Sequence, residues 1–418
     1  MRAGLDEATR RAVEDVLAPV DARLERDYPG EDTSRQPVHT VYVPADRYRA
    51  GLARDWGAQA RAAVDAAGGI AAVLDAAAVP VPLRDAVGER VLAKLDREPV
   101  EDLRIDLEDG YGDHGAGEDD AAVAAAEALR AELATGSATP FAGIRFKSLE
   151  AATRARGLRT LDLFLAALLD GGEVPDGLQL TLPKVTAVEQ VAAMVTVCAA
   201  LERAHGLSAG RLRFEVQVET PQAIVGPDGT AGVATMIQAG AGRVSALHYG
   251  TYDYSASLGI AAAYQSMEHP AADHAKAVMQ VAAAGTGVRL SDGSTNVLPV
   301  GAPEQVRAAW ALHARLVRRS LERGFYQGWD LHPAQLPTRF AATYAFYRQG
   351  LAEATGRLRN YLGRVEGAVL DEPATARALA WFLSRGLDCG AVDAVELDAA
   401  GVDPAALGDL LRRPGAVV

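Results

Sequence analysis

Carboxylates recur at the ends of short β-rich runs in this sequence. Asp106, Glu108 and Asp109 end the run DLRIDLED, Glu219 ends LRFEVQVET, and Asp253 follows RVSALHYG. Carboxylates that converge repel one another unless a cation lies among them, and hard oxygen ligands select Mg²⁺ or Mn²⁺. If the runs that carry them end at one place, these side chains predict a divalent-cation site.

Basic residues lie in the same kind of segment. Arg145, in GIRFK, has a planar guanidinium that can bind a substrate carboxylate through two hydrogen bonds and stabilise a developing enolate. A structural ion pair of Arg145 with Asp106 is the competing interpretation. Lys184, in LPKV, could serve as a Schiff-base nucleophile, but acids positioned for a metal favour a structural role for it. The alternative to a metal site is therefore a set of internal salt bridges with Arg104, Arg145 and Lys184.

Eight β-rich runs alternate with long Ala- and Leu-rich helical stretches, which predicts a (β/α)8 TIM barrel. An open doubly wound sheet would have continuously apolar strands, whereas charged and apolar residues alternate in RIDLE and FEVQVE. The charged face is expected to point into the barrel, with the last charged residue of each strand at the carboxyl-terminal mouth, where barrel enzymes carry their active sites. The runs cover residues 39–44, 102–109, 143–147, 178–185, 212–220, 243–250, 287–291 and 328–332.

The sequence divides into three expected parts. Residues 1–37 are an amphipathic helix and a polar connector, 38–340 are the catalytic barrel, and 341–418 are a helical extension. The helix is expected over 1–27, a long helix over 337–367, and two or three short helices over 372–418.

Composition excludes several classes of partner. The net charge is −13, with 55 acidic and 42 basic residues and no dense basic run, which argues against nucleic acid. No window approaches 18 apolar residues and the N-terminus has no apolar signal core, which predicts a soluble cytoplasmic protein without a membrane span. Cys198 and Cys389 are far apart and are expected to be buried thiols.

Other catalytic motifs are missing. The sequence contains no HExxH or CxxC, and its glycine-containing loops lack the phosphate-binding pattern. His114, His248 and His332 each lie near a strand end, but a lone histidine is more often a packing residue than a base.

Six motifs, DLEDG, the arginine of GIRFK, LPKV, VQVET, HYGTYDY and WDLHPAQ, follow one another in register with the strand ends. Together they resemble the HpcH/HpaI aldolase and citrate lyase β-subunit family of the phosphoenolpyruvate/pyruvate barrel superfamily, over roughly residues 39–340. The resemblance implies a Mg²⁺ ion, with Mn²⁺ as an alternative, held by Glu219 and Asp253. It also implies that Arg145 contacts a 2-oxo acid.

The same resemblance implies further substrate contacts. Asp106, Glu108 and Asp109 would act on the metal through bound waters, or would position the residues that bind it. Tyr252, in HYGTYDY, would contact the substrate, and His332 belongs to an HPAQ turn that would close the pocket. Proteins of this family usually assemble as homo-oligomers, trimers or hexamers.

The expected reaction is the making or breaking of a carbon–carbon bond next to a 2-oxo acid such as pyruvate, oxaloacetate or glyoxylate. Mg²⁺ would chelate the carboxylate and oxo oxygens, and the metal and Arg145 would hold the enolate. Three candidates stand for the base: a metal-bound water steered by Asp109, His114, or an acid such as Asp393 from a neighbouring subunit.

Two alternatives of other classes remain. A CoA-dependent malyl-CoA or citramalyl-CoA lyase, or a malate-synthase-like condensing or thioester-hydrolysing enzyme, would use the same metal site with a CoA thioester. A non-catalytic subunit would bind the 2-oxo acid without turnover. The acidic loop GYGDHGAGEDD at 110–120 would repel the phosphates of CoA, which favours a small free oxo acid.

Overall fold

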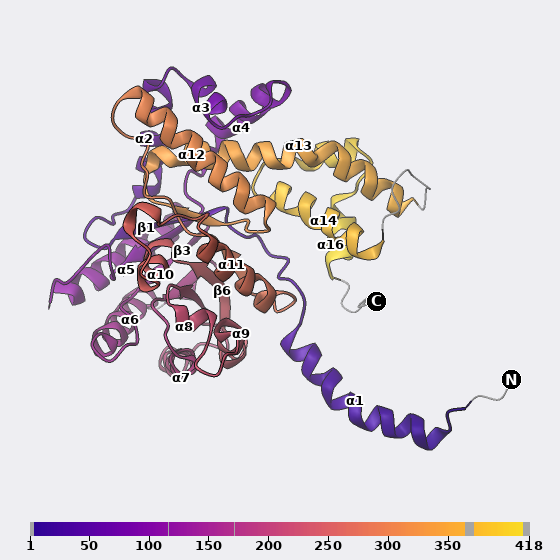
Figure 1. Cartoon of the computed structure of the whole chain (residues 1–418). Coiled ribbons are helices and arrows are strands. Elements are labelled where there is room, and N and C mark those ends of the chain that lie inside the picture. Colours follow the sequence, from indigo (N-terminus) through magenta and orange to yellow (C-terminus); the bar gives the residue numbers. More distant parts are fainter. Residues whose placement is uncertain (1–3, 116, 171, 364–371, 413–418) are drawn as a thin grey trace.

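The computed structural model describes residues 4–115, 117–170, 172–363 and 372–412. Eight parallel strands form a barrel ringed by helices, as the sequence predicts (Figure 1). Each observed strand lies within or overlaps one predicted run, and the bounds differ by at most a few residues. The strands are β1 (His39–Pro44), β2 (Asp102–Asp106), β3 (Phe141–Arg145), β4 (Leu178–Leu182), β5 (Phe214–Val218), β6 (Val244–Tyr249), β7 (Arg289–Ser291) and β8 (Gly328–Asp330).

The strands pair in chain order from β1 to β7, and β8 pairs with β1. The last gap, between β7 and β8, is closed by a parallel bridge between Ser291 and Gln327. Backbone hydrogen bonds from Asp292 to Gln327 (2.8 Å) and from Trp329 to Gly293 (3.1 Å) complete this seam. All eight carboxyl ends therefore face the same pole, as the sequence argument requires.

Helices cover the outside of the barrel, and further helices precede and follow it. The α-helices up to β6 are α1 (Glu7–Asp27), α2 (Leu52–Ala66), α3 (Ile70–Ala76), α4 (Arg84–Arg97), α5 (Gly117–Thr135), α6 (Arg154–Leu168), α7 (Val188–Ala204), α8 (Pro221–Ile224) and α9 (Gly232–Ala239). Those after β6 are α10 (Thr251–Ser257), α11 (Pro270–Ala283), α12 (Pro303–Glu322), α13 (Leu336–Leu362), α14 (Pro373–Asp388), α15 (Ala394–Ala399) and α16 (Pro404–Arg412). Short 3-10 turns are η1 (Val81–Leu83), η2 (Ala262–Tyr264) and η3 (Pro333–Gln335).

Alternation along the strands separates an apolar outer face from a polar interior. Ile105 and Leu107 are fully buried with the rest of the apolar core, whereas Arg104 reaches across the barrel from β2 to β5. Its Nε and Nη2 atoms donate to Glu215 at 3.0 and 2.6 Å, and its Nη1 pairs with Asp102. Since β2 and β5 are not neighbours in the sheet, this contact crosses the lumen. Pairing is what makes a buried charged interior tolerable.

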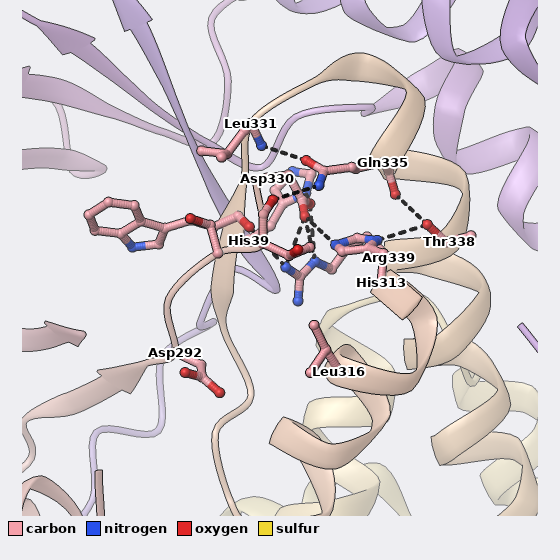
Figure 2. Close-up of polar contacts among 12 residues, drawn as sticks. His39, Asp292, His313, Leu316, Asp330, Leu331, Gln335, Thr338 and Arg339 are labelled. Carbon is pink, nitrogen blue, oxygen red and sulfur yellow. Dashed lines mark hydrogen bonds and ion pairs between the residues drawn. The ribbon is translucent and has the colours of Figure 1, made fainter. Parts of the chain in front are cut away.

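A second buried polar network lies outside the barrel, where β8 meets α12 and α13. Figure 2 shows His39, His313 and Arg339 converging on Asp330. Asp330 is fully buried and accepts from His39 Nδ1 at 2.8 Å, from His313 Nε2 at 3.0 Å and from both Nε and Nη2 of Arg339. His313 Nδ1 in turn contacts Thr338 Oγ1 at 2.8 Å. The network fastens the last strand and the first strand to two outer helices.

The two ends of the chain differ in how they pack. Helix α1 lies away from the barrel and buries none of its residues (Figure 1). By contrast, α13 packs against α4, α12 and α14. The long helix predicted over 337–367 is observed to Leu362, and residues 364–371 lie outside the described residues. Three helices, α14 to α16, follow it within the described residues 372–412, where the sequence predicted two or three.

Both cysteines are free and buried, as the sequence predicts. Within the described ranges, no helix combines the length and the apolar character that crossing a lipid bilayer requires.

Candidate functional site

The carboxyl ends of β2 and β3 are joined by an ion pair. Arg145 Nε and Nη2 each donate to Asp106 at 2.7 Å. The same two Asp106 oxygens also accept from the backbone N–H groups of Glu108 (3.0 Å) and Gly110 (2.8 Å). Asp106 is therefore saturated by the chain itself, and it holds Arg145 in place rather than facing a substrate.

Lys184, just beyond β4, forms ion pairs with the other two carboxylates of the DLED segment, Glu108 and Asp109. Its Nζ atom lies 2.5 Å from Glu108 Oε1 and 2.6 Å from each Asp109 carboxylate oxygen. Burial acts to lower the pKa of Lys184, but the bonds to Asp109 and Glu108 outweigh it and raise that pKa. The ammonium therefore stays charged at neutral pH and neutralises part of this acidic pair.

The two acids that share Lys184 differ in their acidity. Burial raises the pKa of Glu108, which is 9% exposed, above its ordinary value. Burial acts on Asp109 in the same direction, but hydrogen bonds with Glu108 and Lys184 outweigh it and lower the pKa of Asp109. Glu108 is thus the better proton acceptor of the two.

The backbone at Lys184 has an uncommon conformation. Its φ is +50°, in the left-handed region that residues other than glycine seldom adopt. In this conformation the Lys184 N–H donates to Glu219 Oε2 at 3.1 Å, while the side chain turns to Glu108 and Asp109. Strain of this kind gathers at functional sites.

Glu219 follows β5 and is 2% exposed. Burial, with smaller contributions from Asp253 and Glu108, raises its pKa to about 8 against the opposing effect of Arg145 and Lys184. Gly250, at the end of β6, provides the room that Glu219 needs, because a Cβ there would overlap Glu219 Cγ and lie 2.8 Å from its Oε1. A carboxylate with so high a pKa is short of positive charge.

Asp253 lies in the first turn of α10, directly after β6, and is exposed. It is near enough to Glu219 to raise the pKa of that carboxyl. Neither side chain forms an ion pair with a residue in the described part of the chain. The bond from the Lys184 backbone is the hydrogen bond that the structure gives Glu219.

The seven charged residues at this mouth, named here the mouth cluster, fall into three groups by their partners. Arg145 neutralises Asp106, and Lys184 neutralises Glu108 and Asp109 in part. Glu219 and Asp253 are left together without a cation. The cluster comprises Asp106, Glu108, Asp109, Arg145, Lys184, Glu219 and Asp253.

Two bare carboxylates fit a magnesium ion. Mg²⁺ is usually held by one or two carboxylates, with waters and substrate oxygens completing its octahedron. In the residues that the structure covers, no group of three or more His, Cys, Asp or Glu side chains is arranged to hold a metal. The chain therefore offers Glu219 and Asp253 and leaves the other positions to water and substrate.

Aromatic residues that the sequence analysis missed lie beneath Arg145. The guanidinium carbon of Arg145 is 4.6 Å from the centroid of the Tyr42 ring, which itself stacks on Trp329 at 4.5 Å. Tyr42 OH accepts from Gln217 Nε2 at 3.2 Å. The period-two pattern of β1 was the available signal, because Tyr42 shares the inward face with Thr40.

Three predicted residues are engaged elsewhere. His114 is exposed and packs on the ring of Tyr111, with centroids 4.3 Å apart. Asp393 caps α15 and accepts from Arg90 Nη2 at 2.6 Å within the same chain. His248 lies in the lumen, 3.1 Å from Glu215 Oε2. The structure gives His114 and Asp393 no contact with the mouth cluster among the described residues.

The loops after β6, β7 and β8 are tied to one another at the mouth. Tyr252 OH accepts from the Asn296 N–H at 2.6 Å. In the HPAQ turn, Gln335 Nε2 donates to the Thr295 carbonyl at 3.1 Å, and His332 Nδ1 accepts from the Ala334 N–H at 3.1 Å. Burial lowers the pKa of His332. Tyr252 and Gln335 thus join these loops, and His332 stabilises the HPAQ turn from within.

The acidic loop after β2 is less negative than its sequence indicates. Glu118 is buried, with its carboxylate 3.2 Å from Lys147 Nζ and 2.6 Å from Thr160 Oγ1. Asp119 pairs with Arg156 and Arg159 on α6. Ala116 lies outside the described residues. These pairings weaken the charge argument against a CoA substrate.

A family model described as a domain of unknown function, DUF6986, matches residues 17–413. No curated protein matches the sequence.

Several solved structures share the fold. A citrate lyase from Burkholderia xenovorans LB400 matches with a TM-score of 0.58 and 19% identity, over 91% of this chain and 99% of its own. CitE from Mycobacterium tuberculosis, in complex with magnesium, acetoacetate and coenzyme A, matches with a TM-score of 0.47 and 18% identity, over 86% and 100% of the two chains. A magnesium and glyoxylate complex of Haloferax volcanii malate synthase gives a TM-score of 0.49 and 12% identity, over 92% and 100%. The likeness to the citrate lyase shows a common barrel fold.

Proposed function

The chain belongs to the family described as a domain of unknown function, DUF6986, and we propose that it is a Mg²⁺-dependent carbon–carbon lyase or aldolase acting on a 2-oxo acid or its aldol. The observation that carries the proposal is the division of charge in the mouth cluster. Five charged residues there form ion pairs with one another, whereas Glu219 and Asp253 form none among the described residues. The barrel shared with a citrate lyase supports the same class of reaction.

In this proposal Glu219 and Asp253 hold the metal. When bound, Mg²⁺ supplies a Lewis acid that polarises the oxo group and a positive charge that favours the enolate. Because the pKa of Glu219 is raised, this residue would have to lose a proton to hold a metal at neutral pH.

Arg145 binds the substrate carboxylate. Asp106 accepts hydrogen bonds from Nε and Nη2 of Arg145 and so fixes the guanidinium. The third nitrogen of Arg145, Nη1, lies 3.6 Å from Glu108. A preorganised guanidinium costs little ordering entropy on binding and stabilises negative charge that develops in the transition state. Tyr42 supports its flat face. Asp106 and Tyr42 are therefore positioning residues.

Glu108 moves the proton. Its raised pKa suits a general base better than the lowered pKa of Asp109, and Lys184 holds both carboxylates at the mouth. This assigns the base to a residue that the sequence analysis had placed beside the substrate, in place of a metal-bound water steered by Asp109, His114 or Asp393.

The proposal is tested by turnover of pyruvate, oxaloacetate, glyoxylate and their aldols, with and without Mg²⁺ and with and without CoA or acetyl-CoA. We expect Mg²⁺-dependent carbon–carbon cleavage or condensation that EDTA removes. Turnover confined to acyl-CoA mixtures would indicate a malate-synthase-like enzyme. Calorimetric binding of an oxo acid with no product would indicate a non-catalytic subunit. The proposal is refuted if the protein neither binds nor converts any of these compounds.

Replacing Gly250 with alanine is expected to lower Mg²⁺-dependent turnover by ~100-fold, because the new Cβ displaces the Glu219 carboxylate. The measurement is the rate as a function of Mg²⁺ concentration. Gly356→Ala is the matched control, because no atom lies within 4 Å of its added Cβ in the middle of α13. It should raise stability by about 0.5–1 kcal/mol and leave turnover unchanged. Equal activity of the two variants would contradict the role given to Glu219.

A further inference from the structure

A polar cavity lies at the amino-terminal pole of the barrel, opposite the mouth cluster. Its volume is about 280 Å³, and we name it the basal cavity. The connector before β1, the start of β7, the end of α11 and one face of α14 surround it. The residues that matter to its chemistry are Asp32, Arg289, Tyr326, Trp381, Arg385 and Asp388.

Arg385 presents unused hydrogen-bond donors to the basal cavity. Its guanidinium carbon lies 4.0 Å from the centroid of the Tyr326 ring and 4.6 Å from a ring centroid of Trp381. Within the described ranges the guanidinium of Arg385 forms neither a hydrogen bond nor an ion pair. Two aromatic rings thus hold a guanidinium in a fixed orientation while its N–H groups stay free, which is the arrangement that suits bidentate recognition of a carboxylate.

Asp388 lies three residues further along α14, on the same cavity wall. Its carboxylate has no hydrogen-bond or ion-pair partner in the part of the chain that the structure describes. Burial raises its pKa, although Arg35, Arg289 and Arg385 act in the opposite direction. The carboxylate is therefore partly desolvated, and the nearby arginines act on it without forming a direct ion pair.

The remaining charges of the basal cavity are occupied. Arg289 Nη2 lies 3.3 Å from Asp32, and the same guanidinium donates to the carbonyls of Arg35 (2.9 Å) and Ser34 (2.6 Å). Glu31 accepts from the Gly285 N–H at 3.3 Å. Among the described charged residues that line the cavity, Arg385 and Asp388 are then the cation and the anion whose side chains form neither a hydrogen bond nor an ion pair.

We propose that the basal cavity binds a small zwitterion of free amino-acid size, with its carboxylate on Arg385 and its ammonium group on Asp388. A ligand with an anionic group alone would leave the half-buried Asp388 carboxylate without a partner, and an amine alone would leave the half-buried Arg385 guanidinium without one. A volume of about 280 Å³ is near the lower end for ligand pockets, which favours a ligand smaller than a nucleotide or a CoA thioester.

The basal cavity is separate from the proposed catalytic site. Barrel enzymes carry their catalytic residues at the carboxyl-terminal mouth, and this cavity lies beyond the other end of the strands. The zwitterion is thus a second ligand and not the substrate. Its binding does not depend on the proposed function, and either proposal can fail alone.

The test is titration calorimetry of the full chain with the free L-α-amino acids, each at up to about 20 mM. For an amino acid that binds, the acid and the amine that each lack one of its charges are compared, for example alanine with propionate and ethylamine. We expect saturable binding of the zwitterion and binding at least about tenfold weaker for both single-charge analogues. Pyruvate and Mg²⁺ should not compete.

Variants connect the binding to the two residues. Arg385→Gln and Asp388→Asn should each weaken binding at least about tenfold, and Arg385→Lys should lose most of the affinity because a lysine lacks the planar fork. Arg307→Gln, on the exposed face of α12, is the matched control. Asp388→Asn is expected to fold normally, because the Asp388 carboxylate forms no hydrogen bond or ion pair with the described residues. A loss of binding in this variant therefore reflects the lost charge and not misfolding. The proposal is overturned if no amino acid binds, if propionate binds as well as alanine, or if Asp388→Asn leaves the affinity unchanged.

Discussion

Replacing Glu219 with glutamine is expected to lower Mg²⁺-dependent turnover by at least about 10³-fold. The substitution keeps the size of the side chain and its bond from the Lys184 backbone but removes the charge that would attract the metal. Loss of a Lewis acid worth several kcal/mol corresponds to a rate change of that order. The measurement is the turnover rate over a series of Mg²⁺ concentrations.

The same variant is expected to differ from wild type in how its stability depends on pH. Burial raises the pKa of Glu219 from 4.5 to about 8, so the folded, metal-free protein holds a proton that the unfolded chain releases near pH 4.5. This contribution to stability is full below pH 4.5 and is lost as the pH rises through 8. The melting temperature of wild type should therefore fall relative to Glu219→Gln between pH 5 and 9. Addition of Mg²⁺ near pH 7 should release a proton, measured by calorimetry in buffers of different ionisation enthalpy.

A buried glutamate remote from the mouth provides the control for Glu219. Glu202, on α7, is 3% exposed and pairs with Arg243 through bonds of 2.6 and 2.8 Å. Glu202→Gln should destabilise the protein without altering its Mg²⁺ dependence. If Glu219→Gln retains wild-type turnover, or if Mg²⁺ binding releases no proton near neutral pH, Glu219 is not a ligand.

Replacing Asp330 with asparagine is expected to reduce the free energy of unfolding by about 3–5 kcal/mol. Asp330 is fully buried, and the change leaves Arg339 buried without a counter-charge (Figure 2). Removing one partner of a buried ion pair costs this much because the other charge stays desolvated. Denaturant unfolding measures the loss. Glu268→Gln, which breaks an exposed pair with Arg315, should cost no more than about 1 kcal/mol.

The Asp330 network also predicts how acid acts on the protein. Burial opposes ionisation of Asp330, but Arg339, His313 and His39 outweigh it and hold its pKa well below 3.8. Its stabilisation is present above pH 3.8 and disappears as the pH falls further. Burial lowers the pKa of His313 below 6.5, so its contribution is lost as the pH falls through that value. The stability gap between wild type and Asp330→Asn should therefore narrow in acid. A gap that is constant with pH would show that the charge of Asp330 contributes little.

The fold could be predicted from the sequence because it follows from local patterns. The alternation in RIDLE and FEVQVE indicated strands with one polar and one apolar face, and the number of such runs indicated a closed barrel. Both inferences are confirmed by the strand order and by the bond network of Arg104 across the lumen. The sequence also identified which polar residues lie at the strand ends.

The partners of those strand-end residues could not be predicted in the same way. The sequence allowed Asp106, Glu108 and Asp109 to pair with any of three basic residues or to join a metal site. Their assignment to Arg145 and Lys184 depends on side chains from strands about 40 to 75 residues apart in the chain. The left-handed backbone at Lys184 and the space above Gly250 have no residue signature in a sequence without alignment.

By itself the sequence determined the strands, the helices and the polarity of each strand face, because these depend on neighbours within a few residues. Only the tertiary structure decided which charges cancel and which are left over. That distinction separates Glu219 and Asp253 from the other carboxylates at the mouth, and Arg385 and Asp388 from the other charges at the opposite pole. The energy of a buried charge depends on the distances to every neighbouring charge and on the water that burial removes, and the folded chain alone sets both.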